Sequence, residues 1–171
     1  MRQVQEPPQI IVLVGMMGAG KTTTARALAA RLDWPIIDSD VVIEKRTGRT
    51  GADLAADVGV GELHRIEEDV LLESLAGGGP AVITAAASVV TSSRSRQALV
   101  EHATVVWLDA PVDELEERMA AGKHRRPLDR ESVATLLAAR RGYLAKIADL
   151  RLDARRPTDE LVAAIQRTLQ Q

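Results

Sequence analysis

Residues 10–22 join a short aliphatic segment directly to a glycine-rich loop. The segment Ile10–Val14 contains no polar side chain and is rich in β-branched residues, a pattern typical of a strand buried on both faces. The loop over residues 15–22 has the spacing Gly-x-x-x-x-Gly-Lys-Thr. Glycines let the backbone curl so that successive N–H groups point inward, while Lys21 can reach the β- and γ-phosphates and Thr22 can ligate Mg²⁺. The spacing therefore predicts a phosphate-binding loop.

The flanks of this loop are those that a phosphate-binding loop requires. A helix expected over residues 21–32 places bound phosphates at a helix N-terminus, where N–H groups without a helical partner attract anions. A purely structural glycine turn is the alternative, and it does not account for both flanks. We expect ATP and Mg²⁺ as cofactors, with the nucleotide contacted by Gly15, Gly18, Ala19, Gly20, Lys21, Thr22 and Thr23.

Two carboxylates end the next apolar segment, which we expect to be a strand over residues 36–40. Asp38 and Asp40 come at its carboxyl end. In an open parallel sheet that edge binds ligands, so both side chains are expected on the same side as the phosphate-binding loop. The alternative, a helix N-cap and a turn residue before the helical segment 41–45, stays open.

Strand-like and helix-like segments alternate over the rest of the chain. Strands are expected over residues 81–84, 104–109 and 150–153, and helices over 62–72, 93–102, 112–121, 131–148 and 158–169. This alternation predicts an α/β fold, a three-layer sandwich in which one parallel five-stranded sheet carries helices on both faces. The basic segment 122–130 is either a lid that closes cations over the nucleotide or a solvated loop.

Composition restricts the remaining choices. The 171 residues suit one domain, and aromatic residues make up only 2% with no Phe, so the core must be aliphatic. The net charge is −2 with scattered basic residues, which argues against a nucleic-acid partner. Cysteine is absent and no apolar run approaches the ~20 residues of a membrane span. We expect a cytoplasmic monomer without nucleic-acid or membrane partners.

Taken together, these segments resemble shikimate kinases, a branch of the nucleoside-monophosphate-kinase-like phosphate-loop folds. The likeness covers nearly the whole chain and rests on residues 15–22, 37–48, 65–70, 126–128 and Arg140. The resemblance implies a single kinase domain with sheet order 2-3-1-4-5, substrate-binding helices over about residues 39–75, and a lid over about residues 122–130. It also implies transfer of the ATP γ-phosphoryl group to the 3-hydroxyl of shikimate.

The resemblance also implies a role for individual residues. Lys21, Asp40 and Arg126 would be catalytic: Lys21 neutralises phosphates, Asp40 binds the acceptor hydroxyls and accepts the attacking proton, and Arg126 bridges phosphates and substrate. Thr22 would hold Mg²⁺, and Asp38 would reach it through water. Arg118 and Pro157 would sandwich the adenine. The substrate residues would be Asp40, His64, Arg65, Ala86, Ala87, Arg126 and Arg140, with Arg140 pairing with the carboxylate.

Two departures from the family pattern fall on the acceptor side. The chain has Ala85-Ala86-Ala87 where shikimate kinases usually carry three glycines, and His64 where they carry an arginine that binds the substrate carboxylate. Losing that charge-assisted pair would cost about 1.5–3 kcal/mol of binding, on the order of ten- to a hundredfold. The added methyl groups would tighten the pocket, and an alanine held at positive φ would be strained.

These departures leave several interpretations open. Either the site has adapted to a different acceptor, a related cyclitol or sugar-like hydroxyl compound, with Arg65 or Arg141 replacing the lost cation, or shikimate binds weakly. The alanines are otherwise simple filler in an alanine-rich chain. A non-catalytic ATP-binding paralogue is a further alternative, although such a protein has no need of Asp40 or Arg126.

Overall fold

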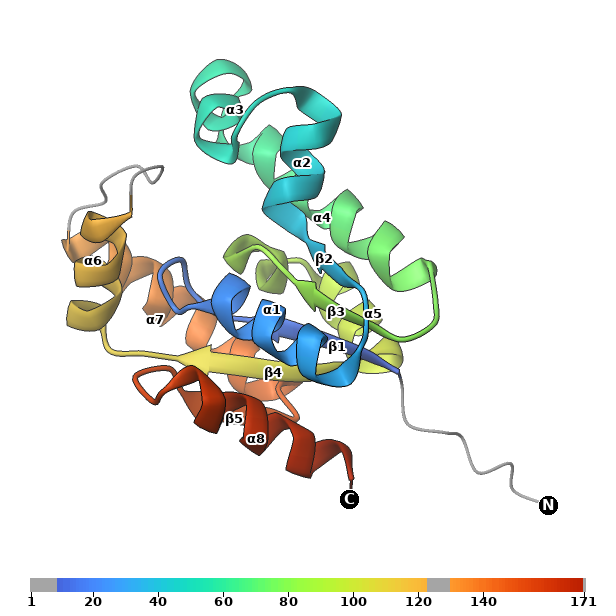
Figure 1. The fold of residues 1–171 in the computed structure, drawn as a ribbon. Coiled ribbons are helices and arrows are strands. Elements are labelled where there is room, and N and C mark those ends of the chain that lie inside the picture. The colour runs from blue at the N-terminus through green and yellow to red at the C-terminus, as the bar shows by residue number, and fades with distance from the viewer. Residues whose placement is uncertain (1–8, 123–129, 171) are drawn as a thin grey trace.

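The computed structural model of the chain describes residues 9–122 and 130–170, and the central sheet organises everything else (Figure 1). The sheet has five strands in the order β2-β3-β1-β4-β5. All its neighbouring strands are parallel. The strands are β1 (Ile10–Val14), β2 (Ile36–Asp38), β3 (Ala81–Thr84), β4 (Thr104–Asp109) and β5 (Leu150–Asp153). This confirms the fold class and the strand order that the resemblance implied.

Helices cover both faces of the sheet, as the alternation of segments predicted. They are α1 (Lys21–Leu32), α2 (Ser39–Thr47), α3 (Gly51–Val58), α4 (Val60–Ala76), α5 (Ser93–His102), α6 (Val112–Ala121), α7 (Arg130–Ile147) and α8 (Thr158–Leu169), with the 3₁₀ helix η1 (Ala87–Thr91) after β3. The sequence analysis assigned no helix to the residues of η1. It also extended the second strand to residue 40, whereas β2 ends at Asp38 because that side chain begins α2.

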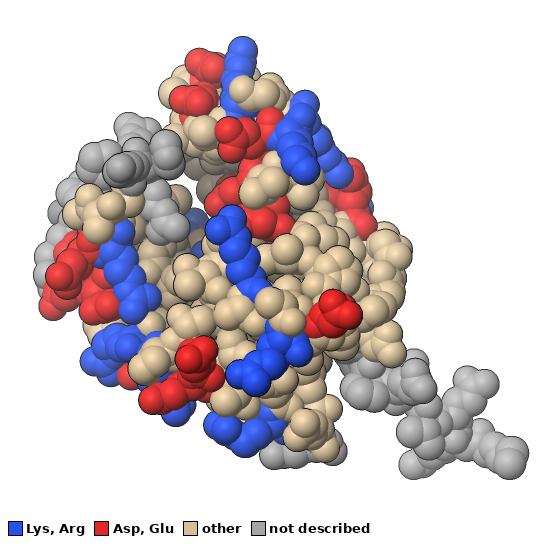
Figure 2. Space-filling model, in the orientation of Figure 1, with Lys and Arg blue, Asp and Glu red and all other residues tan. Residues whose placement is uncertain are grey.

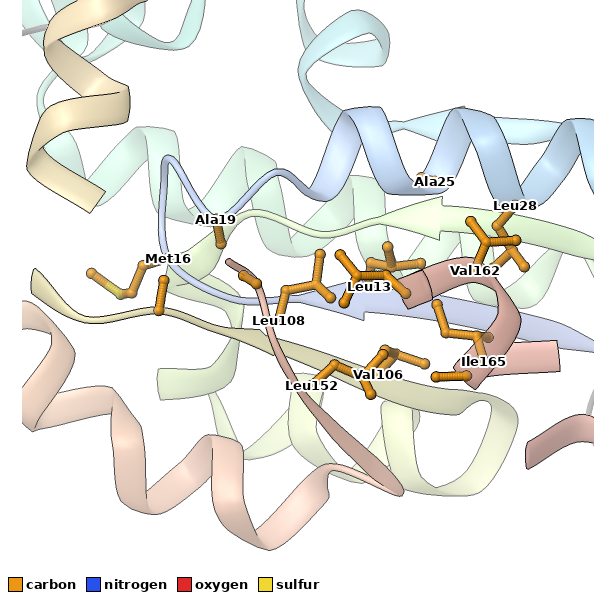
Figure 3. Close-up of a cluster of buried hydrophobic side chains, with 14 of the residues drawn as sticks. Leu13, Met16, Ala19, Ala25, Leu28, Val106, Leu108, Leu152, Val162 and Ile165 are labelled. Atoms are coloured by element: carbon orange, nitrogen blue, oxygen red, sulfur yellow. The ribbon is translucent and has the colours of Figure 1, made fainter. Parts of the chain in front are cut away.

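Alternation along the strands divides the core into two layers. Ile11 and Leu13 of β1 face one layer, together with apolar residues of α1 and α8, and Figure 3 shows this cluster. Val12 and Val14 face the other layer, which α4, α5 and α7 help to fill. Successive side chains of a strand point to opposite faces, so a strand that is apolar at every position must be covered on both.

A separate small cluster holds α2, α3 and α4 together beyond the end of the sheet (Figure 1). Ile43, Leu54 and Val70 are buried there, one from each helix. Thr50 caps α3 in a reciprocal capping box with Asp53, which fixes the turn between α2 and α3. This unit corresponds to the segment of about residues 39–75 for which the sequence suggested substrate binding.

Among the described residues, no helix is both long enough and apolar enough to cross a membrane. Lys and Arg side chains are interspersed with Asp and Glu on the face shown in Figure 2, rather than gathered in one basic stripe.

Candidate active site

The loop between β1 and α1 is tightly curved, and the Lys21 side chain binds to its carbonyl groups. Gly15, Gly18 and Gly20 have φ of 146°, 88° and 87°, a region that side chains with a Cβ rarely adopt. The Lys21 ammonium donates to the carbonyl oxygens of Gly15, at 2.8 Å, and Met16, at 3.2 Å. The lysine therefore lies across the concave side of the loop, where phosphate oxygens would bind.

Asp38 caps α2, one of the alternatives that the sequence left open, and it also contacts the phosphate-binding loop. Its carboxylate accepts a hydrogen bond from the Asp40 N–H at 3.1 Å, and so caps α2. Its second oxygen accepts from the Thr22 hydroxyl at 3.0 Å. A carboxylate and a hydroxyl at this distance, next to the phosphate-binding loop, are the oxygen ligands that Mg²⁺ prefers.

No group of three or more histidine or acidic side chains within residues 9–122 and 130–170 could hold a metal ion by itself. Mg²⁺ in kinases usually binds one or two protein ligands together with phosphates and water, so the Thr22 hydroxyl and the Asp38 carboxylate suit the ion that the loop motif implied.

Charged side chains from four separate elements act on one another beside the loop. Glu67 of α4 is partly buried, and burial raises its pKa. The charge of Asp40 raises that pKa further, whereas the Ser88 hydroxyl, which donates a hydrogen bond to the carboxylate, and the charges of Arg140 and Lys21 lower it. The fold thus brings together two cations and two carboxylates that are far apart in the sequence.

Arg140 of α7 contacts the phosphate-binding loop on this acceptor side. Only 8% of the residue is exposed, and its guanidinium contacts the Met16 sulfur at 3.7 Å. Burial lowers the pKa of Arg140, and the charge of Glu67 opposes that shift. His64 of α4 is partly buried, and its pKa is lowered first by burial and then by the charge of Arg140. His64 and Arg140 are therefore neighbours, as their shared role at a substrate carboxylate would require.

Glu67 and Ser88 are the members of this cluster that sequence reasoning missed. Glu67 lies three residues after His64, so both project from the same side of α4. That spacing was a usable signal, but the charges of α4 resemble an ordinary solvated face. Ser88 gave no signal, because only the fold brings η1 against α4.

Two other predicted cations point elsewhere. Arg65, one of the two arginines that the sequence suggested as replacements for the missing one, has a side chain that is 64% exposed and pairs with Glu62 and Asp69 along α4. Arg141 pairs with Asp109 at 3.6 Å and lies over the Trp107 ring. Neither arginine is among the charged groups that act on His64, Glu67 or Arg140, so a role as a substitute carboxylate ligand stays a prediction.

The alanine segment after β3 adopts an ordinary backbone conformation. Ala86 has φ of −62°, and Asp33 is the one non-glycine residue with positive φ in the described parts of the chain. The strain considered for these alanines is therefore absent. Ala85 is buried, while Ala86 and Ala87 are partly exposed at the carboxyl end of β3. Arg126 and most of the predicted lid lie outside the described residues.

A cavity of about 450 Å³ opens on the other side of the loop, where the sequence suggested adenine binding. Arg118 crosses it: the guanidinium donates to the carbonyl oxygens of Ala19, at 3.3 Å, and Ala154, at 2.8 Å. Pro157 directly precedes α8, between the lining residues Arg156 and Thr158. The complete lining is Gly18, Ala19, Gly20, Thr23, Thr24, Arg118, Ala121, Gly122, Ala154, Arg156, Thr158 and Leu161.

Comparison with known proteins identifies the family. The family model described as shikimate kinase matches residues 17–170. The chain belongs to the shikimate kinase family. The shikimate kinase of Symbiobacterium thermophilum is 38% identical in an alignment of 168 positions, and the match covers 94% of this chain and 96% of that one. The shikimate kinase of Mycobacterium tuberculosis (strain ATCC 25177 / H37Ra) is 41% identical in an alignment of 150 positions, and the match covers 85% of this chain and 84% of that one.

A solved structure supports the same family. The shikimate kinase of Acinetobacter baumannii, in complex with shikimate, superposes with a TM-score of 0.86 at 28% identity, covering 95% of this chain and 93% of that one. As a member of the shikimate kinase family, the chain is a phosphotransferase that acts on a hydroxyl group. Its departures from the pattern described above, His64 and Ala85–Ala87, lie on the acceptor side of the site rather than at the phosphate-binding loop.

Proposed function

We propose that the protein transfers the γ-phosphoryl group of ATP to the 3-hydroxyl of shikimate, with Mg²⁺ bound by Thr22 and, through water, by Asp38. The observation that carries this proposal is the meeting of Lys21, Asp40, Glu67 and Arg140 beside the phosphate-binding loop. Cations there suit phosphates and an acceptor carboxylate, and an exposed aspartate suits a hydroxyl group.

Each side chain has a distinct part in the proposed reaction. Lys21, lying over the loop carbonyls, would bind the β- and γ-phosphates and spread the charge of the transferring group. Asp40, in the first turn of α2, would orient the acceptor hydroxyl and take its proton as the oxygen attacks phosphorus. Bound Mg²⁺ would neutralise charge that develops on the phosphate oxygens.

The acceptor would be held from the opposite side. Arg140 would pair with the shikimate carboxylate, with His64 as its partly buried neighbour, and Ala86 and Ala87 would form the wall at the end of β3. The adenine would occupy the cavity crossed by Arg118, with Pro157 at its edge. From the family motif we propose that Arg126 closes over the phosphates as part of a lid.

We further propose that the enzyme is a cytoplasmic monomer without nucleic-acid or membrane partners. The absence of cysteine and the mixture of charges on the face in Figure 2 support this proposal.

The test is direct detection of product. The protein is incubated with ATP, Mg²⁺ and shikimate, and ³¹P NMR is used to look for shikimate 3-phosphate. The Lys21→Ala variant lacks the ammonium group that would bind the phosphates, so it should form no shikimate 3-phosphate. A panel of cyclitols and sugars is run in parallel. Phosphorylation of one of these instead of shikimate would contradict the proposed acceptor. ATP binding without transfer to any of them would indicate a non-catalytic paralogue.

A further inference from the structure

Two consecutive carboxylates of α4 bind two hydroxyl groups at the ends of η1. The Ser88 hydroxyl donates to Glu67, and the Ser92 hydroxyl donates to Glu68 at 2.9 Å. Ser88 and Ser92 are four residues apart, so the contacts attach both ends of the 3₁₀ helix to α4. η1 begins at Ala87, within the segment that would form the wall of the acceptor pocket.

The same 3₁₀ helix is also attached to α5 and, through α5, to α7. The Arg96 guanidinium of α5 donates to the Val90 carbonyl oxygen at 2.8 Å. It also lies 4.1 Å from the centre of the Tyr143 ring of α7. Tyr143 follows Arg140 by three residues on that helix. Hydrogen bonds and one cation–π contact therefore connect the three elements that carry His64, Ala87 and Arg140.

The two serines differ in the surroundings of the carboxylate that each one binds. Glu67 interacts electrostatically with Asp40, Arg140 and Lys21, and the hydrogen bond from Ser88 lowers the pKa of Glu67, whereas burial raises it. Ser92 has a local task instead, because its hydroxyl oxygen accepts the Ser95 N–H at 3.2 Å and caps α5. Ser88 therefore supports a charged group of the site, whereas Ser92 supports a helix end.

We propose that Ser88 is a positioning residue for the acceptor: its hydroxyl holds the Glu67 carboxylate in place, and so keeps a negative charge near Arg140 on the side where the acceptor would bind. This inference rests on the proposed function. The physical reason is that a partly buried carboxylate needs hydrogen-bond donors to stay ionised, and a fixed negative charge favours the charged form of a guanidinium near it. Ser88 is itself 6% exposed, so water is a poor replacement for its hydroxyl.

Ser88→Ala and Ser92→Ala form a matched pair, since each removes one hydroxyl that binds an α4 carboxylate. We expect Ser88→Ala to raise the KM for shikimate about three- to tenfold, a fraction of the ten- to hundredfold that loss of a direct charged pair costs. The KM for ATP should not change. The acid limb of the kcat/KM profile should move to higher pH, because Glu67 loses the hydrogen bond that favours its charged form. Ser88→Thr, which restores a hydroxyl, should restore the wild-type values.

Ser92→Ala should instead lower the melting temperature through loss of the α5 cap and leave the shikimate KM and the acid limb unchanged. Equal changes of KM in the two variants, or no change in Ser88→Ala, would overturn the proposal. Glu67→Gln adds a second test: it keeps a hydrogen-bonding group of similar shape but removes the charge, so the shikimate KM should rise without an acid limb from this residue.

NMR keeps this test separate from the test of the proposed function. The ¹³C carboxyl signal of Glu67 should titrate at higher pH in Ser88→Ala than in Ser92→Ala, and the Arg140 Nε–H should exchange faster with water. Both can be measured without substrate. If shikimate is not phosphorylated by the wild type, the proposed function fails, yet the NMR comparison still decides whether Ser88 positions Glu67 and Arg140. An unchanged Glu67 titration would refute the link.

Discussion

Gly15→Ala tests how tightly the phosphate-binding loop is built against the sheet. A Cβ at residue 15 would lie 2.5 Å from the backbone oxygen of Leu108 in β4, closer than real Cβ contacts, and the backbone there has φ of +146°. The positive φ costs about 1–2 kcal/mol for a residue with a side chain. Moving packed backbone to relieve the contact costs about 1–3 kcal/mol.

Gly48→Ala is the matched control. Gly48 also has positive φ, +69°, but a Cβ there meets no atom within 4 Å, so only the backbone cost of about 1–2 kcal/mol applies. In a protein of this size each kcal/mol lowers the melting temperature by about 2–4 °C. We therefore expect Gly15→Ala to melt about 2–12 °C below Gly48→Ala in thermal unfolding followed by circular dichroism.

The same pair separates stability from nucleotide binding. The Gly15 carbonyl oxygen accepts the Lys21 ammonium at 2.8 Å, so a shifted loop should weaken ATP binding in Gly15→Ala, measured by calorimetry, but not in Gly48→Ala. Equal melting temperatures and equal ATP affinities in the two variants would refute the reasoning, since they would show that the loop accommodates a methyl group against Leu108 without cost.

Further predictions concern the acceptor half and the metal. Asp40→Asn should reduce kcat by about 10²–10⁴, the range of general acid–base catalysis, in a steady-state assay, and full turnover would remove its assigned role. His64→Arg together with glycine at residues 85–87 should raise kcat/KM for shikimate by up to about ten- to a hundredfold; good activity on another polyol without this gain would favour a changed substrate. His64 has a lowered pKa in the folded chain, so its contribution to stability is complete above the unfolded value of about 6.5 and is lost as pH falls through the folded value. Melting curves of His64→Gln should lack that loss, and identical pH profiles would contradict the assignment. Chelation of Mg²⁺ should abolish transfer, and Thr22→Ala should raise the Mg²⁺ concentration required for half-maximal rate, whereas an unchanged requirement would exclude the Thr22 hydroxyl as a ligand.

The nucleotide half of the site could be predicted because its residues are close together in the chain. A strand, a glycine loop and a helix within residues 10–32 determine where Lys21 and Thr22 must lie, and the structure has these elements at the expected bounds. The helix over residues 39–47 was harder to place. Asp38 is both the last residue of β2 and the N-cap of α2. A pattern of apolar residues does not show at which residue the strand ends and the helix begins.

The acceptor half depends on contacts between distant segments. Arg65 and Arg141 are as cationic as Arg140 and were equally plausible carboxylate ligands from sequence. Their helices turn them toward Glu62 and Asp109 instead. Glu67 resembled one more surface charge on α4, and Ser88 followed an alanine run without any motif. Ser88 and Glu67 come into contact only because η1, which follows β3, packs against α4 in the folded chain.

The sequence by itself determined that this protein is a phosphate-loop kinase with an aliphatic parallel sheet. The strand, the glycine loop and the helix could be predicted because each depends mainly on residues that are neighbours in the chain. Tertiary structure alone decided which charges share the acceptor pocket. The pKa and the direction of a buried charged side chain depend on partners brought by other elements, as Glu67 shows with Ser88, Asp40 and Arg140.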